Sequence, residues 1–131
     1  MIITPKKLYT PIYFFFVITL LNGREEFYNN KVMIYIDNKI TDFQVMDDQV
    51  TTSIPDINNL LKGQGVSAIA QWLPKARPTD QNRNIYLNRF YVVQFRSSKD
   101  NIDKFINDLM LLDAISVSEK IPIVRLSLIH I

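Results

Sequence analysis

The clearest pattern of apolar and polar positions lies in residues 85–126. Residues 85–96 are rich in β-branched and aromatic side chains, which predicts a strand. Residues 100–112 repeat apolar side chains at helical spacing, which predicts a helix with one buried stripe. The stripe consists of Ile102, Phe105, Ile106, Leu109 and Met110. Residues 114–126 return to strand character, so this part of the chain predicts strand, helix, strand.

The first half predicts the same order with weaker signals. Residues 31–37 alternate as a strand does, with Val32, Ile34 and Ile36 on one face and Met33 and Tyr35 on the other. Residues 38–53 contain two short strand-like pieces around Asp47-Asp48, which predicts an inserted hairpin with its turn at these aspartates.

A helix and a strand are expected next. Pro55 suits the first turn of a helix through Leu61, with Ile57, Leu60 and Leu61 facing inward. Gly63 and Gly65 are expected to end it, because glycine tolerates a left-handed backbone. Residues 66–73 alternate Val66, Ala68, Ala70 and Trp72, which predicts a strand, and residues 74–84 lack periodicity and suit an exposed connection.

The order β-α-β-β-α-β predicts an α+β fold of the ferredoxin-like kind. Its sheet would have four antiparallel strands, with both helices on one face. We expect one domain over residues 24–126, followed by a short tail over 127–131.

The strand at 85–96 has two distinct faces. Phe90 and Val92 share the side opposite Arg89, Tyr91, Val93 and Phe95. If the latter row meets the helices, Phe90 and Val92 lie on the open face of the sheet, beside Met33 and Tyr35. This apolar patch is either a partner surface or is covered by the hairpin at 39–53.

Composition excludes several functional classes. The chain has 131 residues, 47% hydrophobic and 21% charged, which is ordinary for a folded domain. A net charge of +2 without a basic run gives no reason to expect nucleic acid as a partner. The absence of cysteine excludes a thiol nucleophile and thiolate metal sites, and three glycines are few for a phosphate-binding loop.

The N-terminus predicts export. Lys6 and Lys7 precede the apolar run 12–21, which is about half the length of a membrane span and suits the core of a signal peptide over residues 1–23. We therefore expect a secreted or periplasmic protein with no stable membrane span. The alternative is that this run is a buried strand or helix of the domain.

The residues offer little catalytic chemistry. His130, the single histidine, stands next to last, and a serine triad needs a supported histidine base. Asp47-Asp48 lacks a calcium-binding loop around it and suits a turn. Ser97-Ser98 is expected to cap the following helix. The strand aromatics invite comparison with RNA-recognition domains, but the expected glycines are missing. We expect no enzymatic activity, no cofactor and no metal.

Two segments resemble the pro-domains of subtilisin-like serine proteases (subtilases), particularly the fervidolysin N-terminal pro-domain type. They are Leu87–Phe95 (LNRFYVVQF) and Ile115–Pro122 (ISVSEKIP), and Trp72-Leu73-Pro74 before a charged loop is also similar. The resemblance spans roughly residues 31–126. It implies a folding chaperone and inhibitor, in cis or in trans, for a subtilase catalytic domain.

The resemblance also implies site residues. The docking face would include Phe90, Val92 and Glu119. The tail bound in the protease cleft would consist of Ile121, Pro122, Ile123, Val124, Arg125 and Leu126.

The sequence departs from the family in two ways. Lys120 stands where the family commonly has proline, and no protease domain follows Ile131, so a stand-alone inhibitor and a truncated precursor both stay open. The alternatives to a pro-domain are an exported ferredoxin-like module with an unrelated protein partner and, more remotely, a small-ligand or RNA binder.

Overall fold

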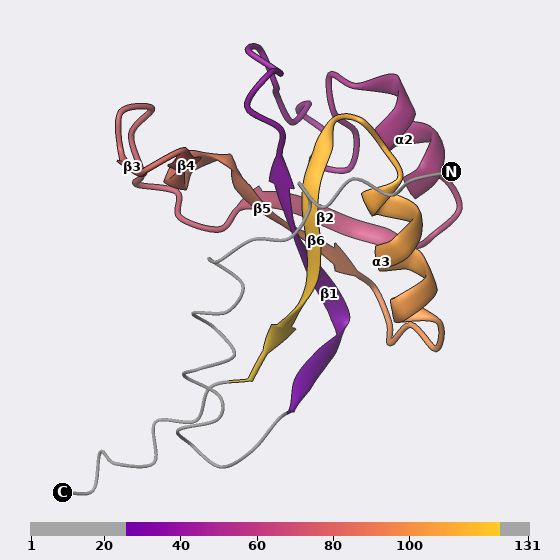
Figure 1. Cartoon of the computed structure of the whole chain (residues 1–131). Helices are drawn as coiled ribbons and strands as arrows, with labels where there is room; N and C mark the ends of the chain where they lie inside the picture. Colours follow the sequence, from indigo (N-terminus) through magenta and orange to yellow (C-terminus); the bar gives the residue numbers. More distant parts are fainter. Residues whose placement is uncertain (1–25, 124–131) are drawn as a thin grey trace, which may run out of the picture.

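The computed structural model describes residues 26–123. One sheet carries two helices, and a short hairpin projects beside it (Figure 1). The elements are β1 (Phe27–Ile36), α2 (Pro55–Leu61), β2 (Val66–Gln71), β3 (Gln81–Asn82), β4 (Ile85–Tyr86), the 3₁₀ turn η2 (Leu87–Arg89), β5 (Phe90–Phe95), α3 (Ile102–Met110) and β6 (Ile115–Pro122). The α+β class expected from the sequence is confirmed.

The main sheet has four strands in the order β2-β5-β1-β6, and each neighbouring pair is antiparallel. This arrangement is compatible with a ferredoxin-like fold. The central pair has Met33 opposite Val92 and Tyr35 opposite Phe90, as expected for these two strands.

The larger core lies on the face of the sheet that we call the helix face. Val32, Ile34 and Ile36 of β1 are buried there, at most 1% exposed, as their alternation predicted. Both helices contribute to this same cluster. Their buried members are Ile57, Leu61, Ile102, Phe105, Ile106 and Leu109. Burying each such side chain contributes about 1.5–3 kcal/mol relative to exposure, so this core is the main source of stability.

The helix boundaries agree with local signals only in part. In α2, Pro55 occupies the first turn, and Gly63 and Gly65 after the helix both have φ +77°. The prediction that Ser97-Ser98 caps α3 is wrong. Asn101 holds the N-cap position without a side-chain cap, and the Ser98 hydroxyl donates to Asn29 Oδ1 at 3.1 Å. Ser98 therefore connects the approach to α3 with β1.

The strand predicted over 85–96 is interrupted. Residues 85–86 pair with 81–82 in a separate hairpin, and η2 turns the chain before β5 begins at Phe90. Arg89 fixes this turn, because its guanidinium donates to the carbonyl oxygens of Asp37 at 2.9 Å and Ile40 at 2.5 Å, and weakly to that of Ile36 at 3.4 Å. Composition alone does not reveal this break, since both sides of it favour strand.

The expected alternation in β2 fails at its first residue. A register shift between Val66 and Ala68 places Val66 in the helix-face core together with Ile69. Ala68 and Ala70 face the other way. One extra residue reverses the faces of all later residues in the strand, which is the effect of a bulge.

The segment between β1 and α2 forms less of a hairpin than predicted. Its one bridge joins Val45 and Thr52. The turn at Asp48 is confirmed, because its carboxylate accepts the amide N–H groups of Val50 and Thr51 at 3.0 Å. These bonds lower the pKa of Asp48. Apolar residues of this segment, including Phe43, pack on the helix-face core, so it does not cover the opposite face.

β6 lies at an edge of the sheet, and Pro122 fits this position. The amide of Ile123 donates to the Glu26 carbonyl at 2.8 Å, which makes these two residues a hydrogen-bonded pair. The next pair, Phe27 and Pro122, therefore directs its backbone groups away from each other. Because the missing N–H of Pro122 would point away from β1, proline at this position removes no hydrogen bond between β6 and β1.

We predict that Arg89→Lys destabilises the domain by about 1.5–3 kcal/mol, the scale of hydrogen bonds to a charged group. Lysine keeps the charge but cannot reach carbonyls from several directions. Urea unfolding followed by circular dichroism measures the change, and an unaltered midpoint would show that the guanidinium does not hold the turn.

Candidate functional site

The face of the sheet opposite the helices, here called the outer face, is ordered in cross-strand rows. The first row consists of Phe90, Tyr35 and Val117. The second consists of Ala70, Val92, Met33 and Glu119. The third contains Ala68, Gln94 and Lys31. Residues opposite one another in an antiparallel sheet project on the same side, so these rows form one surface.

The chain's own segments cover the first row. Tyr35, Phe90 and Val117 are 3–6% exposed, and Trp72, Ile85 and Leu87 pack against them. The ring centroids of Tyr35 and Phe90 lie 4.9 Å apart, and those of Trp72 and Phe90 lie 5.8 Å apart, both edge to face. Phe90 lies on the predicted face, but it is not available for docking as expected. The hairpin that carries β3 and β4 takes that space, instead of the segment 39–53.

Hydrogen bonds from Tyr35 hold this hairpin in place. The Tyr35 hydroxyl accepts the amide N–H of Tyr86 at 2.9 Å and donates to Asn38 Oδ1 at 2.5 Å. The Asn38 amide in turn donates to the carbonyl of Asn84 at 2.7 Å. Burial raises the pKa of Tyr35, so the phenol stays protonated and can donate at ordinary pH.

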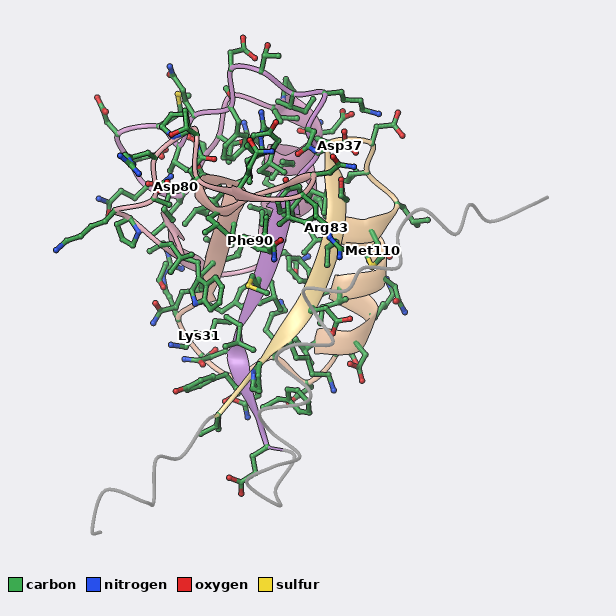
Figure 2. All side chains as sticks on the ribbon, turned by 60° about the vertical axis from the view of Figure 1, so that its left-hand side comes forward. Lys31, Asp37, Asp80, Arg83, Phe90 and Met110 are labelled. Atoms are coloured by element: carbon green, nitrogen blue, oxygen red, sulfur yellow. The ribbon has the colours of Figure 1, made fainter. Side chains whose placement is uncertain are left out.

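The rest of the outer face is hollowed into a groove of about 360 Å³. In Figure 2 Lys31 is labelled below Phe90; Phe90 belongs to the covered row, whereas Lys31 lines the groove. The groove is lined by Tyr28, Lys31, Met33, Trp72, Val92, Ile121 and Pro122. The lining is mainly apolar with a single cation, and Val92 is partly exposed as the docking prediction requires. Such a groove suits an apolar side chain of a partner.

Glu119 lies beside this groove in an apolar setting. It stands opposite Met33, and its neighbours on the same face, Val117 and Ile121, belong to the outer-face cluster or pack against it. Burial raises the pKa of Glu119 above its usual value, and the adjacent Lys120 offsets this only in part. The Lys120 ammonium points to the helix face, where it pairs with Asp103 at 3.1 Å. The Glu119 carboxylate has no ion pair or hydrogen bond within residues 26–123.

The predicted tail begins inside the sheet. Ile121 and Pro122 belong to β6, Pro122 stands opposite Phe27, and the Ile123 amide donates to the Glu26 carbonyl, so the first part of the predicted tail is not a free extension. The sheet extends this far because the pairing of β6 with β1 continues past Glu119, and binding of these residues in a protease cleft stays a prediction. Residues 124–126 and the tail 127–131 lie outside the described residues, as do the signal peptide predicted over 1–23 and His130.

Within 26–123, no three acidic or histidine side chains are grouped as metal ligands would be. No helix in that range has the length and apolar character needed to cross a bilayer.

Sequence reasoning missed part of the groove. Tyr28 and Lys31 were expected to precede or begin the first strand, yet β1 starts at Phe27 and brings both to the groove. The Lys31 ammonium lies 4.3 Å from the centre of the Tyr28 ring. The alternation of Met33 and Tyr35, extended backward by two residues, could have placed Lys31 on this face.

No protein-family model, curated protein or solved structure matches this chain. The outer face and its groove are therefore interpreted from their own residues.

We predict that Glu119→Gln stabilises the isolated domain at pH 7. A carboxyl group whose pKa is raised by folding contributes most stability below its unfolded pKa, near 4.5, and that contribution is lost as pH rises through the folded pKa. Glutamine avoids this loss, with a gain of up to about 1 kcal/mol for a partly exposed group. Thermal unfolding at pH 4 and pH 7 measures it. A variant no more stable than wild type at pH 7 would contradict the cost assigned to this carboxylate.

Proposed function

We propose that this chain is a pro-domain, or a pro-domain-like inhibitor and folding chaperone, of a secreted subtilisin-like serine protease. In this proposal the fold is ferredoxin-like and performs no catalysis. The uncovered part of the outer face binds the catalytic domain, and the residues after Ile123 enter the protease cleft. The sequence segments 87–95 and 115–122 supply the resemblance on which the choice of partner rests.

The observation that carries the proposal is the continuity of the groove with the end of β6. Ile121 and Pro122 line the groove, and Ile123 follows them directly at the last pairing with β1. A protein seated in the groove would therefore lie close to Ile123, from which the chain continues into residues 124–126. An extended segment there could add to a cleft edge through backbone hydrogen bonds.

Glu119 provides a second support. Its carboxylate lies on the docking side, half-buried among apolar side chains and without a partner in the described part of the chain. An ionised carboxylate in that setting destabilises the free domain. The N-terminus of a helix in the partner would supply N–H donors and a favourable dipole for it. Docking would then relieve a cost that the free domain carries.

One observation favours the alternative, an exported interaction module with an unrelated protein partner. The hairpin covers the first row of the outer face, so a partner meets only the second and third rows and the groove. This leaves a smaller surface than a completely bare sheet would offer. The two functions differ in the role of residues 124–126, which only protease inhibition requires.

We predict that Val92→Gln weakens binding to a bacterial subtilisin catalytic domain by at least about tenfold, because it places an amide in the apolar groove. Leu111→Gln is the matched control, since Leu111 is 80% exposed at the end of α3. Surface plasmon resonance with an inactive catalytic domain gives both affinities. Equal losses in the two variants would exclude the groove as the docking site.

We further predict that truncation after Ile123 abolishes inhibition but retains binding. This end point keeps β6 and its pairing with β1 intact. Peptidase assays measure inhibition with active enzyme, and resonance measures binding with inactive enzyme. Full inhibition by the truncated chain would favour a partner role that does not use the cleft.

A further inference from the structure

The charged side chains of the described residues are divided between the two sides of the domain. The helix side, including the segment between β1 and α2, has nine aspartates against six cations. The aspartates are Asp37, Asp42, Asp47, Asp48, Asp56, Asp100, Asp103, Asp108 and Asp113, and the cations are Lys39, Lys62, Arg89, Lys99, Lys104 and Lys120. The outer face and its hairpin have five cations against three carboxylates. The cations are Lys31, Lys75, Arg77, Arg83 and Arg96, and the carboxylates are Asp80, Glu119 and Glu26, which lies two residues before Tyr28 and so on the same face.

The hairpin and the loop that leads into it carry part of the positive charge on the outer-face side of the domain. Arg77 is neutralised by Asp80, whose carboxylate lies 3.2 Å from its guanidinium. Lys75 and Arg83 are exposed and make no ion pair within residues 26–123. Figure 2 labels Arg83 on the hairpin that carries β3 and β4, and this hairpin comes forward in that view. Met110, also labelled there, belongs to α3. The hairpin therefore adds two uncompensated charges beside the docking face.

Strands β1 and β5 carry the rest of the positive charge on the outer-face side. Lys31 lines the groove, and Gln94 stands opposite it in the third row. Arg96 comes two residues after Gln94, so it continues the outer-face side of β5 just beyond the strand, and it is exposed. Cations thus lie on both sides of the exposed docking surface, and the two carboxylates there, Glu26 and Glu119, are half-buried.

We propose that the docking surface fits an acidic surface on its partner protein, and that Lys75, Arg83, Lys31 and Arg96 steer the two proteins together. This inference rests on the proposed function, and it adds that the partner's contact surface is negatively charged. Separated charges of opposite sign on the two sides of a domain orient it during diffusion, which raises the association rate at low salt. Exposed cations act mainly on that rate, and dissociation depends on the buried contacts of the groove.

A nucleic acid is the other polyanion that a positive surface could meet, and the geometry disfavours it. Sheets that bind RNA stack bases on exposed aromatic rings. Here Phe90 and Tyr35, the central rings of the outer face, are 4% and 3% exposed beneath the hairpin. The Lys31 ammonium already lies over the ring of Tyr28. An acidic protein surface needs no base stacking and suits the apolar groove.

The test compares charge reversals on the two sides of the domain. The double variant Lys75→Glu/Arg83→Glu changes only exposed hairpin side chains, and Lys39→Glu/Lys62→Glu is its control with the same change in net charge. Stopped-flow or resonance measurements give the association rate with an inactive bacterial subtilisin catalytic domain at about 50 and 500 mM salt. A single-stranded RNA homopolymer serves as a second probe. Circular dichroism confirms that both variants are folded.

We expect the hairpin variant to associate at least about fivefold more slowly than the control at 50 mM salt, and the two to converge at 500 mM as screening increases. Equal rates for both variants, or no dependence on salt, would overturn the inference while leaving the proposed function standing. Absence of any complex with the wild-type domain would overturn both. RNA binding that is lost only in the hairpin variant would assign these cations to nucleic acid and also overturn it.

Discussion

The fold depends on one strand that is buried on both sides. β1 runs through the middle of the sheet, and five consecutive residues from Val32 to Ile36 are at most 3% exposed. Alternation sends three of them into the helix-face core and leaves Met33 and Tyr35 for the outer face. The described part of the chain has only two helices, and both cover the same side. The other side must be covered by a loop, by a partner, or by both.

The chain's own hairpin covers one part of this face. It packs over Tyr35 and Phe90, and the Tyr35 hydroxyl accepts the amide N–H of Tyr86 in β4. The groove is less completely covered within the described residues, because Val92 stays partly exposed there although Met33 is only 3% exposed. The outer face therefore divides into a half covered by the hairpin and a half that holds the groove. Substitutions under the hairpin should cost stability, whereas under the proposed function substitutions in the groove should cost affinity.

Much of the fold could be predicted from periodicity, and the errors share a physical origin. The faces of β1, the stripe of α3 and the pairing of Met33 with Val92 were predictable because burial imposes their spacing. The break at η2 was not, since it depends on hydrogen bonds from the Arg89 guanidinium to the carbonyl groups of Asp37 and Ile40, which are distant in sequence. The bulge after Val66 was not either, since it depends on how β2 pairs with β5. For the outer face, alternation placed Val92 opposite the helices, and the family resemblance grouped Glu119 with it, as the register has them. The sequence could not show that the hairpin would bury Phe90, or that β6 would extend through Pro122.

Pro122, in the edge strand β6, affects whether two copies of the chain can associate edge to edge. An outer strand normally presents free amide groups that template the strand of another molecule, which is a route to fibrils. Pro122 turns its missing N–H toward that open margin, so the terminal part of β6 lacks a donor for an incoming chain. Edge-to-edge polymerisation through this part of β6 is thereby discouraged, next to the groove that Pro122 also lines.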